Sequence, residues 1–184
     1  YADGRKGKDF EAGIKGVLQA LLASPHFLFR LEEIPSGVRP GQNYRVTDVD
    51  LASRLSYFIW GTAPDAELQK VAGNGTLHTP AVLEKQVRRM LADPRAESLS
   101  TRFASQWLRL QDVEKIHPDA LLFPSFDNEL AESYKRETEL LFDSIVREDR
   151  SILDVFTADY TFVNERIAKV YHIPNIVGEE FRRV

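Results

Sequence analysis

Apolar residues recur along most of the chain at the spacing of one face of an α-helix. They stand three and four positions apart over 10–22, and the same spacing returns over 51–59, 82–91 and 128–148. Prolines interrupt the pattern at intervals, because proline pushes the residue before it out of the α region. Residues 159–163 are the one short piece expected to be extended. The pattern therefore predicts an all-α protein, a single helical bundle-like domain of about six to eight helices with proline-marked breaks.

Residues that favour helix starts stand in front of several of these segments. A side-chain oxygen at such a position accepts hydrogen bonds from the amides of the first turn. The predicted caps are Thr47, Thr79, Asp127 and Asn164. The helix after Asp127 is expected to be the longest, at about 128–148.

Three connections between helices carry more specific expectations. A short helix is expected to start at Pro64-Asp65, where the missing amide of proline is tolerated. Residues 95–110 resume the helical spacing after the Asp93-Pro94 break. The segment 116–126 holds two prolines and several apolar residues, and we expect it to be irregular and to lie over the core.

The richest cluster of proline and glycine lies at 34–46, which we interpret as a linker. It divides the chain into residues 1–33, the C-terminal helix of a preceding module, and residues 47–173, the main helical domain. Residues 174–184 are expected to start a connection to a following module. Because the chain opens without Met, we read it as a fragment of a longer protein.

Composition narrows the class of protein. The net charge is −4 with acidic and basic residues interspersed, so no nucleic acid is expected as a partner. The chain holds no run of the ~20 apolar residues that a transmembrane segment needs. It has no cysteine, which excludes disulfides, thiolate metal sites and a covalently attached haem. We therefore expect no cofactor in this fragment.

Several short segments, taken in order, resemble those of one family. They are 23–30, 51–61, 64–65, 88–95, 103–108, 123–126, 137–139, 159–166 and 168–171. The series is similar to the planctomycete-type domains of unknown function that accompany cytochrome c modules in large exported bacterial proteins. The resemblance covers about residues 10–172.

This resemblance implies a periplasmic or extracellular protein, secreted and linked to electron transport. It implies neighbouring domains of the same parent chain as partners, among them a cytochrome c module that holds haem c elsewhere in the parent protein. It carries no catalytic residue set, so the catalytic residues stay unknown. The Cys-x-x-Cys-His motif that attaches haem c is absent from these residues.

Glu114 and His117 form the sharpest local pattern. A Glu-x-x-His step places both side chains on one helical face, as in carboxylate-bridged di-iron bundles. Such a site needs two steps and two further glutamates, whereas this chain holds one step followed directly by Pro118. A weak metal site and an ordinary surface loop both remain open.

Arg54 lies within an apolar stripe, between Leu51 and Leu55. A buried arginine needs a carboxylate partner, because an unpaired buried charge is very costly. We therefore predict a structural ion pair between Arg54 and Glu137 or Asp65.

Trp60 and Trp107, with Tyr57 and Phe58, leave two interpretations open. They form an exposed platform for a ligand, or they fill the core because aromatic side chains bury so much area.

The sequence favours an accessory or scaffolding helical domain of an exported, cytochrome-c-linked protein, with no complete catalytic site in the fragment. The alternative is part of an extracytoplasmic enzyme, either a redox enzyme or a surface-polymer hydrolase whose site needs further domains. Paired carboxylates serve such a hydrolase as acid and base. The candidates on the long helix are Glu129, Glu132, Glu137 and Glu139. The isolated fragment is therefore interpreted as a non-enzyme, with the enzyme reading left open.

Overall fold

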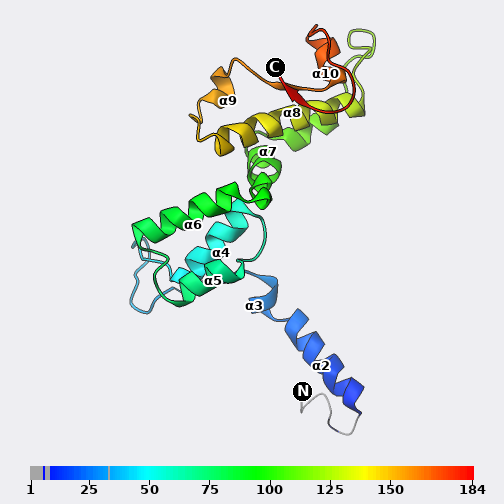
Figure 1. Cartoon of the computed structure of the whole chain (residues 1–184). Helices are drawn as coiled ribbons and strands as arrows, with labels where there is room; N and C mark the ends of the chain where they lie inside the picture. Colours follow the sequence, from blue (N-terminus) through cyan, green and yellow to red (C-terminus); the bar gives the residue numbers. More distant parts are fainter. Residues whose placement is uncertain (1–5, 7–8, 33) are drawn as a thin grey trace. The chain divides into compact units, whose positions relative to one another are not determined.

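The computed structural model describes residues 6, 9–32 and 34–184. Helices make up most of the described chain, with two short strands near the C-terminus (Figure 1). This confirms the all-α class that the hydrophobic spacing predicts. Contacts divide the chain into two units, residues 1–47 and residues 48–184. Within the described residues, no helix is both long and apolar enough to cross a membrane.

The first unit holds helices α2 (Phe10–Leu22) and α3 (Pro25–Leu28). Asp9 caps α2 by accepting a hydrogen bond from the Ala12 amide at 2.9 Å. Large apolar side chains in this unit are more than half exposed; they are Phe10, Leu18, Leu21, Leu22, Phe27, Leu28, Phe29, Leu31 and Ile34. Residues 34–47, which include the expected linker, form no helix or strand.

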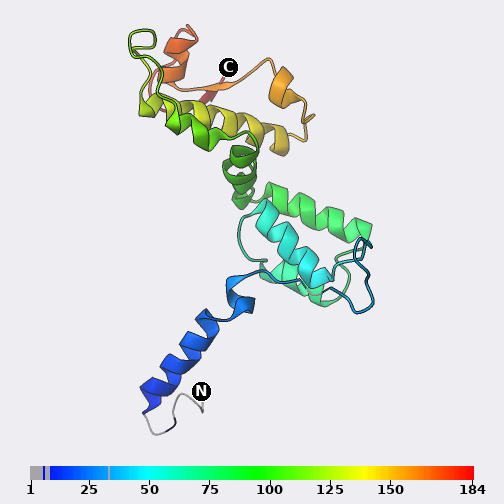
Figure 2. The ribbon, with the colours of Figure 1, turned by 180° about the vertical axis from the view of Figure 1, so that it is seen from behind.

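The second unit begins with three packed helices, α4 (Asp48–Ile59), α5 (Ala66–Gly73) and α6 (Pro80–Ala92) (Figures 1 and 2). Their apolar faces meet in a first core cluster, as the spacing predicts. Its buried members are Ala52, Ile59, Trp60, Leu68, Ala72, Leu77, Met90, Ala96, Leu99, Ala104 and Phe142. Phe142 comes from the long helix, so the cluster joins distant parts of the sequence.

The junction of α4 and α6 centres on Trp60, which is 4% exposed. Its indole Nε1 donates to the Met90 carbonyl at 2.9 Å. That carbonyl is among the last four of α6 and also accepts from the amide of the C-cap residue Asp93 at 3.3 Å. Arg95 covers the ring, with Cζ 3.6 Å from the ring centroid. Its hydrogen bonds are the main cause that lowers the pKa of Asp93 to about 2.

Helix α5 starts one residue later than the expected Pro64-Asp65 position. Asp65 is its N-cap and accepts from the Leu68 amide at 2.9 Å. The same carboxylate binds the Arg89 guanidinium at 2.7 Å, and that hydrogen bond is the main cause that lowers the pKa of Asp65. The charged cap thus holds α5 against α6.

The predicted helix over 95–110 is wrong as one continuous element. It is divided into η1 (Pro94–Glu97), the π-helical turn η2 (Leu99–Ala104) and the single turn α7 (Ser105–Trp107). The 3₁₀ helix η3 (Leu110–Lys115) follows.

Side-chain hydroxyls explain the break in regular winding. Ser100 Oγ and Thr101 Oγ1 both donate to the Glu97 carbonyl, at 2.8 and 3.0 Å. They occupy an acceptor that regular helix would offer to a backbone amide, and such competition bends or loosens helices.

The long helix α8 (Asn128–Arg147) follows Asp127, as predicted. After the short α9 (Asp154–Thr157), the strand β1 (Phe162–Val163) and helix α10 (Glu165–Val170) lie along α8 (Figure 1). A second cluster forms there from Leu130, Val163, Ile167 and Ala168.

The last residues pair with β1. Strand β2 (Arg182–Arg183) runs antiparallel to it, with Phe162 opposite Arg183. Thr161 and Val184 exchange two backbone hydrogen bonds, at 3.0 and 2.9 Å. The segment 174–184, expected as the start of a connection, is therefore hydrogen-bonded to the second unit. Ile173, Ile176 and Phe181 pack against the second cluster.

The segment 116–126 is irregular, as expected, but the prediction that it lies over the core is wrong for its tip. Leu121 is 92% exposed and Leu122 74%. The amides of Leu122 and Phe123 both donate to the Asp119 carbonyl, at 3.1 and 2.8 Å. This tight turn leaves the side chains of the tip exposed.

Candidate functional site

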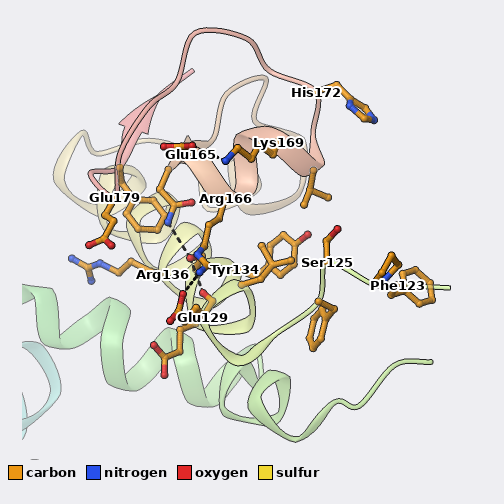
Figure 3. Close-up of a pocket in the computed structure, with 18 of the residues that line it drawn as sticks. Phe123, Ser125, Glu129, Tyr134, Arg136, Glu165, Arg166, Lys169, His172 and Glu179 are labelled. Atoms are coloured by element: carbon orange, nitrogen blue, oxygen red, sulfur yellow. Dashed lines mark hydrogen bonds and ion pairs between the residues drawn. The ribbon is translucent and has the colours of Figure 1, made fainter. Parts of the chain in front are cut away.

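A groove of about 1230 Å³ opens on the surface of the second unit (Figure 3). One side is the loop over 122–126, and the floor is the first half of α8. The other side is α10 with residues 178–181. These pieces lie up to about sixty positions apart in the sequence, so the fold alone brings them together.

Two capping residues fix the helices that frame the groove. Asp127 Oδ1 accepts from the Leu130 amide at 2.8 Å and starts α8. Asn164 Oδ1 accepts from the Ile167 amide at 3.1 Å and starts α10. The buried Asn164 Nδ2 also donates to Ser133 Oγ at 3.0 Å. One asparagine therefore caps α10 and ties it to the middle of α8.

The loop side of the groove is apolar. Leu122 and Phe123 remain exposed by 74% and 58%. Phe126 of the loop, Tyr134 of the floor and Phe181 of the opposite side add apolar surface and pack on the second cluster. Exposed apolar residues gathered in one place are typical of a binding surface.

The α10 side is ionic, and its cations are bound to neighbouring carboxylates (Figure 3). Arg166 binds Asp127 at 2.9 Å and also Glu129. Lys169 binds Glu165 at 2.6 Å. A hydrogen bond from the Gly178 amide, helped by Lys169, lowers the pKa of Glu165. Both cations are thus neutralised where they stand.

The third cation of the groove is Arg136 on α8, which binds Glu97 at 2.7 Å. Glu132 and Glu179 also line the groove, and neither forms an ion pair with any residue of the described chain. The lining therefore carries more negative than positive charge. An isolated cation would find partners here, and an anion would not.

Next to the groove, Glu137 is buried inside α8, with 9% of its surface exposed. Thr161 Oγ1 donates to its Oε1 at 2.5 Å, and the Tyr171 hydroxyl donates to its Oε2 at 3.0 Å. Burial raises the pKa of Glu137 and outweighs these two hydrogen bonds. Burial and the nearby Glu137 charge also raise the pKa of Tyr171 and of Tyr134.

This burial predicts a pH dependence of stability. The folded-state pKa of Glu137 lies above its unfolded value, so the folded chain binds the proton more tightly. The stability that protonated Glu137 gives to the folded state is fully present below the unfolded pKa of about 4.3. It is lost as the pH rises through the folded pKa. Glu137→Gln should not lose stability in this way as the pH rises, because the glutamine amide has the shape of the carboxyl group and does not ionise. We expect the free energy of unfolding of Glu137→Gln, relative to that of the original protein, to be higher at pH 8 than at pH 4. Urea unfolding at the two pH values measures it.

The exposed Glu132→Gln serves as the control for this pH comparison. Its difference from the original protein should change little between the two pH values. An equal pH response of the two variants contradicts the role given to Glu137.

The two residues of the weak metal candidate have other partners. Glu114 binds Lys135 at 2.8 Å, and this hydrogen bond lowers the pKa of Glu114. His117 Nδ1 lies 2.8 Å from the Lys115 carbonyl. Across residues 9–32 and 34–184, no three His, Cys, Asp or Glu side chains gather in a way that could hold a metal ion.

The residues of the predicted ion pair lie in different surroundings. Arg54 is exposed, so the assumption that it is buried in the stripe is wrong, because this position of α4 faces outward. Asp65 binds Arg89, and Glu137 accepts from Thr161 and Tyr171. Asp65 thus caps α5, and the buried Glu137 links α8 to Thr161 and Tyr171 through hydrogen bonds.

The four aromatic residues separate. Trp60 is core, whereas Phe58 and Trp107 are 55% and 48% exposed. Phe103 joins the exposed pair: its centroid lies 5.4 Å from Phe58 and 6.0 Å from Trp107. The Trp107 and Phe103 rings are stacked at 21°, so they cover each other and do not form a flat platform.

The groove itself was not predicted. The sequence assigned no role to Arg166, Lys169 or Glu179, since charged residues are ordinary at a protein surface. Phe123 stood only in a segment that carries the family resemblance. The available signal was the pair of capping residues Asp127 and Asn164, which mark the two helix starts that frame the groove.

The fold and the groove define a helical domain with a surface suited to binding, in which the charges near the groove are mostly paired among themselves. Residues 46–173 match the model of the PSD4 family, described as proteins of unknown function (DUF1592). The chain belongs to this family. A search of curated proteins found no match, and neither did a search of solved structures.

Proposed function

We propose that this chain is an accessory, scaffolding domain of an exported, cytochrome-c-linked multidomain bacterial protein. The observation that carries the proposal is the exposed apolar surface of the tip at 121–123, together with that of the first unit. Soluble proteins rarely expose contiguous apolar patches unless these meet a partner. The domain holds its neighbours in position through these surfaces.

The first unit supports this role. Helix α2 and the residues after it expose apolar side chains that the unit does not cover itself. An amphipathic helix that leaves its apolar face open fits a neighbouring module. We assign that face to the preceding module, to which residues 1–33 belong in this proposal.

The ionic groups support binding over catalysis. Arg166, Lys169 and Arg136 are each held by a carboxylate, and Glu114 is held by Lys135. Arginine stays protonated in proteins, and the ion pair with Lys135 holds Glu114 in its charged form. With no cysteine in the chain, a c-type haem belongs to another module of the parent protein. The periplasmic or extracellular location belongs to the same proposal.

An enzymatic role is the second candidate, favoured by Glu137. A buried carboxylic acid with a raised pKa, hydrogen-bonded to a tyrosine beside a groove, is the kind of group that serves as general acid. In that case the chain supplies part of the site of a redox enzyme or a surface-polymer hydrolase.

The parent gene tests the proposal first, since it must encode a signal peptide and at least one Cys-x-x-Cys-His motif. The haem module it encodes is then titrated with this chain in a calorimeter. We expect a dissociation constant of about 1–100 µM, typical of a small and transient interface. Leu121→Ser should weaken the binding about tenfold, because it removes the most exposed apolar side chain of the tip.

A parent gene without such a motif, or a haem module that does not bind, contradicts the scaffolding proposal. Turnover of a surface polymer by the parent protein, lost in Glu137→Gln, supports the enzymatic role instead.

A further inference from the structure

The groove has two unlike sides, and a ligand must satisfy both. In Figure 3, Phe123 stands on one side, and Glu179, Arg136 and Glu129 stand on the other. The first side offers apolar contact from Leu122 and Phe123, both more than half exposed. The second side offers charge. The matching ligand therefore carries an apolar part and a charged part some distance apart.

The sign of the ligand charge follows from the pairing of the groove residues. Arg166 and Lys169 are already neutralised by Asp127, Glu129 and Glu165. A ligand anion would have to displace one of these carboxylates. Glu132 and Glu179 have no ion pair within the described residues, so a ligand cation gains a partner without breaking one.

The size of the groove favours a stretch of polypeptide. Pockets for small molecules usually measure about 300–1,000 Å³ and enclose their ligand. This groove of about 1230 Å³ is larger and lies open at the surface (Figure 3). Peptide grooves combine side-chain pockets with an open path for the backbone.

We propose that this groove binds a peptide segment of a partner protein in which a bulky apolar side chain is flanked by a lysine or arginine. The apolar side chain packs against Leu122 and Phe123. The cation meets the carboxylate of Glu132 or Glu179. This inference deepens the scaffolding role and rests on it, since it names the chemistry of one partner segment.

Three fluorescent peptides probe the groove of the 184-residue chain. The first is Lys-Leu-Phe-Leu-Lys, the second replaces both lysines with glutamate, and the third keeps the lysines around Ser-Gly-Ser. Fluorescence anisotropy at low and high salt gives the affinities. We expect the first peptide to bind at least tenfold more tightly than either of the others. Its affinity should fall as salt screens the exposed charges.

Matched substitutions locate the site. Glu179→Gln and Glu132→Gln should each weaken the first peptide by up to about fivefold, the range of exposed ion pairs. The neighbouring Glu180→Gln should have no effect, because Glu180 does not line the groove. Leu122→Ser should weaken binding about tenfold, whereas Leu153→Ser should not, since Leu153 is 66% exposed and lies outside the groove.

Four outcomes overturn the inference. They are absence of binding by the first peptide, equal binding of the acidic peptide, equal effects of Glu179→Gln and Glu180→Gln, and equal effects of Leu122→Ser and Leu153→Ser. Concentration-dependent self-association that Leu122→Ser abolishes also overturns it, because a second copy then fills the groove.

The two proposals fail separately. A haem module that binds this chain while the basic peptide does not leaves the scaffolding role standing without the groove ligand. A basic peptide that binds the groove while the haem module does not gives the groove a ligand, and the cytochrome link is then wrong.

Discussion

Replacing Trp60 with alanine should lower the free energy of unfolding by about 3–5 kcal/mol, the range for removal of a buried aromatic side chain. The ring is 4% exposed and lies in the first core cluster. Its loss also removes the hydrogen bond to the Met90 carbonyl and the surface on which Arg95 stacks. Urea unfolding followed by far-ultraviolet circular dichroism measures the change without depending on tryptophan fluorescence.

Trp107→Ala is the matched control, because it removes the same side chain from a position that is 48% exposed. We expect it to cost well under half as much as Trp60→Ala. Equal losses at the two positions contradict the central place given to Trp60.

Gly61→Ala should cost about 1–3 kcal/mol, mainly because a residue with a Cβ must adopt a left-handed backbone there. Gly61 has φ of +66°, a region that residues with a Cβ rarely adopt. A Cβ there would stand 2.5 Å from Arg102 Nη1 and 2.5 Å from Ser98 Oγ. It would also disturb the hydrogen bond from Arg102 to the Gly61 carbonyl at 3.0 Å. The same urea titration measures the loss.

Gly73→Ala is the control, and we expect it to change the free energy of unfolding in the opposite direction. Gly73 ends α5 with no positive φ, and a Cβ there meets nothing within 4 Å. The alanine should stabilise the protein by up to about 1 kcal/mol, because it reduces the freedom of the unfolded chain. A stabilising Gly61→Ala, or a strongly destabilising Gly73→Ala, contradicts the backbone argument.

The helices were largely predictable because their signals are local. Apolar spacing and an oxygen-bearing cap suffice to place α8 after Asp127 and α10 after Asn164. The region after Pro94 was not predictable in this way. There the hydroxyls of Ser100 and Thr101 both bind one carbonyl, and the hydrophobic spacing carries no sign of these hydrogen bonds.

The groove was beyond sequence reasoning for a different reason. Whether its charged residues are free to bind a ligand depends on ion pairs with residues far along the chain. Arg136 pairs with Glu97, and Arg166 pairs with Asp127. Burial in the tertiary structure likewise decides that Glu137 holds its proton more tightly. Arg54 shows the converse, since an apolar neighbourhood in sequence did not bury it.

The pairing of β2 with β1 bears on where this domain should be considered to end. The family match stops at residue 173. The backbone amide and carbonyl of Thr161, however, are hydrogen-bonded to the backbone of Val184, beyond that boundary. Gly178, Glu179 and Phe181, which form part of the groove, also lie beyond that boundary. Expression and sequence comparison of relatives should therefore extend at least ten residues past the matched region, about the length of the segment that closes the sheet. A domain trimmed at residue 173 would keep α10 and lose the part of the groove formed by Gly178, Glu179 and Phe181.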